Sequence, residues 1–239
     1  MGVAPLAPRS TWLGLALPLG LIVFWCALAM AAHAYPGGYD WRYQTISVLL
    51  YPDQNPAGYR WGWAALELCG LLGIAWIADL RLRIGRVAPG AAVGVLWSLQ
   101  LGFVCMCCAV LPDRLLVPKA HEALVIAAFL AICLGMARGL FLTQYSRNES
   151  RPRRAVAPLR AWFLAAIPFV PLLLAGLTQI YLTLERPSLP WVGPAWRTLG
   201  VPPYLSFALW EWVSCTLFSL CLLMLWHADI IRWGNAPRR

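Results

Sequence analysis

The chain has 239 residues, of which 61% are hydrophobic and only 12% are charged, and its formal net charge is +9. Soluble domains have roughly 45–50% apolar and about 25% charged residues, so this composition is typical of a protein whose solvent is a lipid bilayer. The excess of basic residues is not accompanied by any recognisable nucleic-acid-binding motif. The composition therefore argues against a nucleic-acid partner and predicts the lipid bilayer as the main partner.

Six apolar runs approach the roughly 20 residues that a helix needs to cross about 30 Å of hydrocarbon. No run alternates with the period of two that barrel strands require, so the spans are expected to be helices. The first run is longer than the apolar core of a secretory signal and is interpreted as a retained span. We predict an all-α polytopic membrane bundle that forms a single domain over residues 1–239, with spans at Thr11–Ala34, Trp61–Leu80, Pro89–Leu111, Ala120–Thr143, Ala161–Leu184 and Tyr204–Ile231.

The basic residues divide unevenly between the two ends of these runs. With the N-terminus inside, twelve arginines fall on the cytoplasmic side, and six Lys or Arg residues fall on the opposite side. Short cytoplasmic loops of membrane proteins carry an excess of Lys and Arg. The distribution predicts that both termini are cytoplasmic and that the protein is a multi-pass component of the cell (inner) membrane.

The outer connections, residues 35–60 and 185–203, are rich in Pro, Gly, Tyr and Trp. Aromatic residues at this level are typical of the membrane–water interface. Asp40 follows two glycines and is expected to cap a short helix that Pro52 ends. Such a helix would lie in the plane of the interface.

Polar side chains occur inside the predicted spans, mostly toward their outer ends. Glu67 and Glu211 lie about 9 Å and about 10 Å below the start of their runs at 1.5 Å per residue. Ionisable groups inside the hydrocarbon are expensive and mark pairing or functional positions. Two interpretations stay open, a structural hydrogen-bond network and the lining of a ligand site. The candidate ligand-binding residues are Glu67, Glu211, Gln100, Arg42, Arg60 and Arg114, the arginines being suited to an anionic headgroup.

Histidines and carboxylates near the outer helix ends suggest a metal site. His227 lies about 24 Å along the last run from Glu211, so the three histidines of the chain cannot meet. His33, His121 and a carboxylate such as Glu122 could form a zinc site with two histidines and one carboxylate. A nucleophilic Ser47 would need a general base within reach, and no G-x-S-x-G motif surrounds it.

Cys105 and Cys108 form a C-x-x-C pattern near the end of the third run. This spacing occurs in thiol–disulfide exchange proteins. Here it lies within an apolar helix with no base nearby, and cysteine is also an ordinary small packing residue. Both interpretations of the pair stay open.

Two segments, TISVLLYPDQNPAGYRWGW and LPDRLLVPKAHEAL, carry a family resemblance. They resemble an uncharacterised family of six-span bacterial membrane proteins, in which an Ile-Ser motif precedes the second span and a Pro-Asp…His motif joins the third and fourth. The matching positions are Ile46, Ser47, Pro112, Asp113 and His121. A more distant similarity is to the seven-helix membrane hydrolases that include alkaline ceramidases and progestin/adiponectin receptors. It implies Ser47, Asp113 and His121 as catalytic candidates, although the last span lacks that group's paired histidines.

The leading functional hypothesis is a membrane protein with an outward-facing polar pocket that binds a lipid-like amphiphile or docks a membrane partner. The first alternative is a metal-assisted lipid hydrolase that uses zinc, with Ser47 or bound water in the reacting role. The second alternative is an accessory subunit of a larger membrane complex. The sequence does not decide whether the protein is an enzyme.

Overall fold

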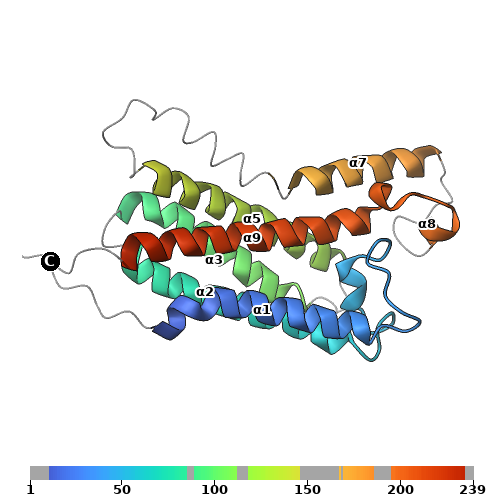
Figure 1. The fold of residues 1–239 in the computed structure, drawn as a ribbon, viewed down its shortest axis with the longest axis horizontal. Coiled ribbons are helices and arrows are strands. Elements are labelled where there is room, and N and C mark those ends of the chain that lie inside the picture. The colour runs from blue at the N-terminus through green and yellow to red at the C-terminus, as the bar shows by residue number, and fades with distance from the viewer. Residues whose placement is uncertain are drawn as a thin grey trace, which may run out of the picture. The chain divides into compact units, whose positions relative to one another are not determined.

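The computed structural model describes residues 11–84, 89–111, 118–145, 167, 169–185 and 195–234. Within these residues every regular element is a helix (Figure 1). The short elements are η1 (Ile46–Leu49), α8 (Ala195–Thr198) and η3 (Pro203–Leu205). The long elements are α1 (Thr11–His33), α2 (Tyr59–Ile84), α3 (Pro89–Cys108), α5 (Pro118–Tyr145), α7 (Phe169–Glu185) and α9 (Phe207–Gly234).

The long helices occur where the apolar runs predicted them, so the all-helical fold class is confirmed. Among the described residues, three segments in α1, α2 and α9 are long and apolar enough to cross a membrane: Leu13–His33, Tyr59–Arg81 and Phe207–His227. Shorter apolar segments occupy α3 and α5. These apolar helices are compatible with an integral membrane protein. The number of spans and their orientation remain predictions.

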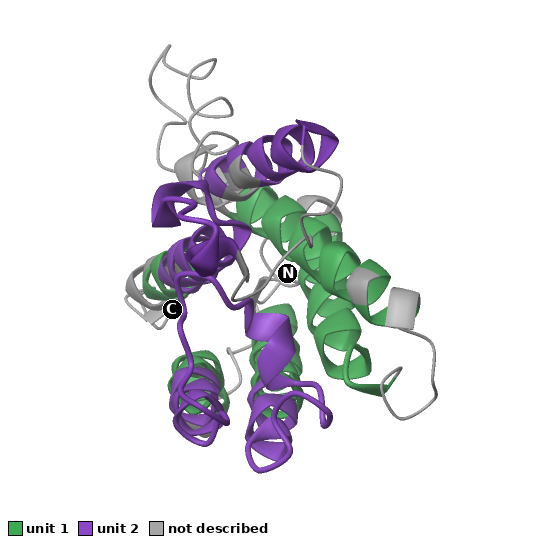
Figure 2. Ribbon diagram, turned by 90° about the vertical axis from the view of Figure 1, so that its right-hand side faces the viewer, with its two compact units in different colours: residues 1–23, 66–165, 221–239 green, residues 24–65, 166–220 purple. Residues whose placement is uncertain are grey.

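The chain divides into two compact units (Figure 2). Unit 1 comprises residues 1–23, 66–165 and 221–239, and unit 2 comprises residues 24–65 and 166–220. The boundary falls inside α1, α2 and α9, so each of these helices contributes to both units. The single domain expected from the sequence stays a prediction.

In unit 1, α3 and α5 pack against each other through small residues. A Cβ atom on Gly135 would lie 2.6 Å from Leu99 Cγ, and one on Gly102 would collide with Ile132. Only glycine permits this close approach, as in many membrane helix pairs. Arg138 of α5 adds a polar link, because its guanidinium donates to the Gly94 carbonyl at 3.2 Å and to Ser98 Oγ at 3.1 Å.

In unit 2, Asn55 joins the end of α1 to the start of α2. Its side chain is fully buried. Nδ2 donates to the carbonyls of Ala31 at 3.0 Å and Leu49 at 3.3 Å, while Oδ1 accepts the Gly58 N–H at 3.1 Å. The Ala31 carbonyl lies in the last turn of α1, where helix carbonyls lack intrahelical partners. Asn55 therefore satisfies backbone groups that the chain reversal would leave open.

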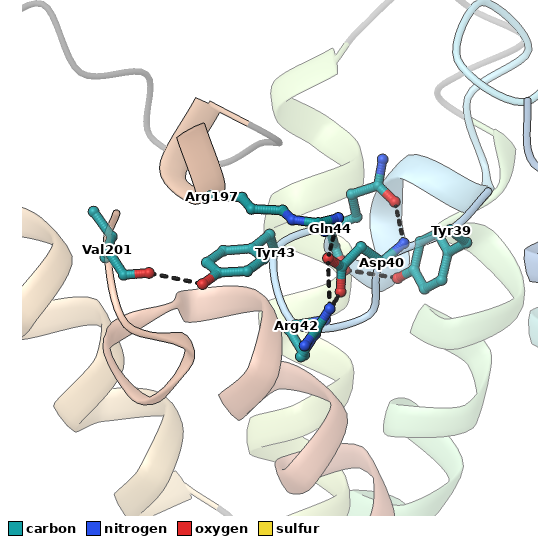
Figure 3. A network of polar contacts seen from close by, with 7 residues as sticks. All are labelled: Tyr39, Asp40, Arg42, Tyr43, Gln44, Arg197 and Val201. Atoms are coloured by element: carbon teal, nitrogen blue, oxygen red, sulfur yellow. Dashed lines mark hydrogen bonds and ion pairs between the residues drawn. The ribbon is translucent and has the colours of Figure 1, made fainter. Parts of the chain in front are cut away.

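Two segments of unit 2, residues 34–58 and 195–206, pack together and are called the cap. Tyr43, Trp196 and Val201 form its buried apolar cluster, against which Leu182 of α7 and Leu205 of η3 pack. The Tyr43 hydroxyl donates to the Val201 carbonyl at 2.7 Å, which ties the two segments together (Figure 3).

Candidate functional site

Glu211 of α9 is the carboxylate that holds the cap. Its Oε2 accepts the backbone N–H of Ile46, the first residue of η1, at 2.7 Å. Thr45, which precedes η1, makes no side-chain capping bond. The first N–H groups of a helix lack intrahelical acceptors, and a nearby carboxylate satisfies them well. Glu211 thus supplies from another segment the cap that the local sequence does not.

Tyr39 organises the backbone beside this contact. Its hydroxyl lies 2.7 Å from the Gln44 carbonyl and 2.9 Å from the Thr45 carbonyl, and it accepts the indole N–H of Trp212 at 2.9 Å. Burial raises the pKa of the Tyr39 hydroxyl above its ordinary range. The hydroxyl is therefore neutral at physiological pH and acts as a fixed hydrogen-bonding group next to Ile46.

Asp40 of the same segment forms ion pairs with Arg42 and Arg197 (Figure 3). The Asp40 carboxylate accepts bonds from Arg42 Nε at 2.8 Å and Nη2 at 3.1 Å, and Arg197 Nη1 lies 3.4 Å away. The hydrogen-bonded Arg42 guanidinium lowers the pKa of Asp40, and Asp40 in turn raises the pKa of Arg42. The Asp40 N–H donates to Gln44 Oε1 at 2.7 Å.

These contacts correct the prediction that Asp40 caps a short helix. The Asp40 carbonyl accepts the N–H groups of Tyr43 and Gln44, which makes one turn. The regular helix is the single 3-10 turn of η1, four residues long. Bonds from the Tyr39 hydroxyl and from Glu211, rather than helical backbone bonds, fix residues 44–46.

The predicted ligand-binding residues divide between the units. In unit 2, Arg42 is exposed and bound to Asp40, while Arg60 is exposed and donates from Nε to the Tyr59 hydroxyl at 3.2 Å. In unit 1, Glu67 and Gln100 are half-buried. Arg114 lies outside the described residues. Of this set, Glu211 and Arg42 are the two whose contacts belong to the cap.

The predicted catalytic and metal residues are also distributed over both units. Ser47 lies half-buried in η1, and His33 is the exposed last residue of α1. His121 of unit 1 is buried, and its Nδ1–H donates to the Ala109 carbonyl at 2.6 Å. Asp113 and the side chain of Glu122 lie outside the described residues. Among the described residues, no group of three His, Cys, Asp or Glu side chains is arranged to hold a metal ion.

The two cysteines of the C-x-x-C pattern are at least partly buried in the helix bundle. Cys105 is buried and Cys108 half-buried, and both carry free thiols. Their neighbour Cys107 contacts α2, where a Cβ atom on Gly70 would collide with its sulfur, and its thiol lies 3.6 Å from the Glu67 carbonyl. The redox interpretation gains no further support from these contacts.

Four features of unit 2 were not predicted from the sequence: the side-chain bonds of Asn55 and Tyr39, and the full burial of Gln179 and Ser214. No local pattern indicates the side-chain bonds of Asn55 or the hydroxyl bonds of Tyr39. Gln179 of α7 and Ser214 of α9 are both fully buried in unit 2. A glutamine within an apolar run is a visible signal, but its burial depends on which face α7 turns inward.

No protein-family model matches the chain, and neither a curated protein nor a solved structure matches it. The function is therefore inferred from the structure itself. Its described elements are all helical, its apolar helices are compatible with membrane insertion, and the carboxylate of Glu211 on the apolar helix α9 bonds the cap.

Proposed function

We propose that the protein is a multi-pass membrane protein of the cell membrane that binds a lipid-like amphiphile beneath its cap. In this proposal six helices cross the bilayer, both termini are cytoplasmic and the cap faces outward. The two-to-one distribution of basic residues supports the orientation. Exposed aromatic side chains on the cap, Trp41 and Tyr204, suit the headgroup level. The Ile46–Ser47 and Pro112–Asp113…His121 motifs keep the resemblance to the six-span bacterial family within the proposal.

The observation that carries the binding role is the Glu211–Ile46 contact. A carboxylate within an apolar helix is costly, and a neutral residue could have capped η1 at lower cost. The two oxygens of a carboxyl group can accept several hydrogen bonds. Within the described part of the chain, the Ile46 N–H donates one of them. The chemistry therefore favours a ligand whose headgroup donates hydrogen bonds, through a hydroxyl or an ammonium group.

The arginine expected to meet an acidic part of the headgroup is Arg60 rather than Arg42. Asp40 already binds the Arg42 guanidinium with two hydrogen bonds. Arg60 is exposed at the start of α2, with its guanidinium 5.7 Å from the centre of the Tyr59 ring. The exposed Trp61 follows it directly. A cation over one aromatic ring, followed in the sequence by an exposed tryptophan, suits the headgroup level of a membrane.

Mass spectrometry of the lipids and metals that remain on the purified protein tests this function. Glu211→Gln keeps an oxygen acceptor for the Ile46 N–H but removes the charge, so the cap is expected to persist. We expect one amphiphile to be enriched on the wild type, to be lost from Glu211→Gln, and to remain on the matched control Glu185→Gln, whose carboxylate is exposed on α7.

Identical lipid profiles for all three proteins would contradict the binding role. The same preparation examines the hydrolase alternative, because stoichiometric zinc that disappears on His121→Ala would favour metal-assisted hydrolysis instead. Orientation is tested separately with a C-terminal fluorescent reporter that folds only in the cytoplasm, and an absence of fluorescence would contradict the cytoplasmic C-terminus.

A further inference from the structure

Two buried polar side chains of unit 2 make no hydrogen bond within the described part of the chain. Gln179 and Ser214 are both 0% exposed. Neither the amide nitrogen nor the amide oxygen of Gln179 has a partner, and the Ser214 hydroxyl has none. In folded proteins about nine in ten buried polar groups are bonded, and each unpaired one costs about 1–3 kcal/mol. Such groups mark positions kept for a reason other than packing.

Ser214 differs from other helical hydroxyls of the same unit. Thr178 and Thr183 of α7 and Thr216 and Ser219 of α9 each bond the carbonyl four residues earlier, at 2.6–2.9 Å. This bond is the usual way in which a hydroxyl on an apolar helix is satisfied. The Ser214 hydroxyl does not make it, although its own helix offers the same geometry. The Ser214 hydroxyl is therefore not satisfied by its own helix in the way that the other four hydroxyls are.

Gln179 is unusual for its helix. Among the described side chains of α7 it alone is buried, while large apolar residues on the same helix are exposed, Leu173 at 63%, Leu177 at 56% and Leu184 at 78%. A helix that needed only to pack would place leucine at the buried position. Instead α7 turns an amide inward and leucines outward.

Each of the two side chains lies about 10 Å or less, measured along its own helix axis, from a helix end that adjoins the cap. The end of α7 and the start of α9 both adjoin the cap, because Leu182 of α7 and Leu205 of η3 pack against the same cluster. Gln179 lies six residues before the end of α7, about 9 Å along the axis, and Ser214 lies seven residues into α9, about 10 Å. Ser214 also follows Glu211 by three residues, which places both on one face of α9.

We infer that Gln179 and Ser214 hydrogen-bond an uncharged amide or hydroxyl group of the amphiphile, one helical turn below Glu211. This inference rests on the proposed function and specifies its ligand class. A glutamine amide both donates and accepts, and a serine hydroxyl does the same, so a neutral group that does both complements them. Neither residue offers a charge to balance an ionised group at this depth.

The test compares two soluble amphiphiles on delipidated protein in detergent. A medium-chain N-acyl ethanolamine carries an amide and a hydroxyl, and the matching methyl ester lacks both donors. Binding is measured as the ligand-dependent rise in the thermal unfolding midpoint, titrated to give an affinity. The variants are Gln179→Leu, Gln179→Met and Ser214→Ala, with Thr178→Val and Thr216→Val as controls whose hydroxyls are satisfied by their own helices.

We expect the wild type to bind the N-acyl ethanolamine at least roughly tenfold more tightly than the ester, because loss of a buried hydrogen bond costs about 1–3 kcal/mol. Gln179→Leu, Gln179→Met and Ser214→Ala should lose this preference, and the controls should keep it. The ligand-free Gln179→Leu protein should also unfold at a higher temperature than the wild type, since an unpaired amide has been removed.

Equal affinity of the wild type for the two compounds would overturn the inference, and so would an undiminished preference in Gln179→Leu. If Glu211→Gln abolishes binding while both Gln179 variants keep the wild-type preference, the proposed function stands and the deeper contact fails. If none of these variants alters binding, both fail.

Discussion

The burial of Asn55 leads to a quantitative prediction about the stability of unit 2. Asn55→Ala removes three hydrogen bonds, to the Ala31 and Leu49 carbonyls and from the Gly58 N–H. Each is worth about 1 kcal/mol net, so the free energy of unfolding should fall by about 3 kcal/mol. The site is fully buried, so water cannot replace the lost partners without rearrangement.

The assay is denaturant titration of the detergent-solubilised protein, followed by tryptophan fluorescence. Gln54→Ala is the control, because Gln54 is the exposed neighbour of Asn55. Asn55→Asp separates the two roles of the side chain. It keeps the acceptor for the Gly58 N–H but places a carboxylate oxygen against two carbonyls, so it should destabilise the protein at least as much as alanine. A loss below about 1 kcal/mol for Asn55→Ala, or a milder effect for Asn55→Asp, would refute this account.

Two further predictions concern the cap. Tyr43→Phe removes the hydrogen bond to the Val201 carbonyl and should lower the free energy of unfolding by about 1 kcal/mol. Tyr204→Phe, at an exposed position, should leave the free energy of unfolding unchanged. Equal effects of the two substitutions in the same denaturant titration would contradict a stabilising role of the buried bond. The Asp40 pKa is lowered in the folded state, so its contribution to stability is present above the unfolded pKa of about 3.9 and is lost as pH falls through the folded value. Asp40→Asn should therefore flatten the acid side of the stability profile measured by thermal unfolding, and an unchanged acid limb would show that Asp40 contributes nothing.

The helices could be predicted from the sequence because their apolar runs are local signals. The apolar stretch that begins at Thr11 and the one that begins near Trp61 correspond to α1 and α2 within a few residues. A hydrogen-bond partner for Glu211 was also expected, since a carboxylate in such a run must find one. The identity of that partner could not be predicted, because the Ile46 N–H lies 165 residues away in the sequence.

The conformation of residues 39–46 could not be predicted for the same reason. The local pattern favours a helix that starts at Asp40. The Tyr39 hydroxyl and Glu211 override that preference with bonds to the backbone, and the Trp212 indole N–H holds the Tyr39 hydroxyl in place. Asn55 was similarly hidden, because its main partner Ala31 lies 24 residues earlier.

The most direct test of the central claim, that Glu211 and the cap form an amphiphile site, is photo-crosslinking in native membranes. A lipid-like probe with a hydroxyl headgroup and a photoreactive group beside it is added to membranes that contain the protein, and the labelled peptides are identified by mass spectrometry. We predict labelling within residues 39–46 and around Glu211, and we expect Glu211→Gln to reduce it. Labelling confined to exposed apolar positions such as Leu173 and Leu177 of α7, and unchanged in the variant, would contradict it.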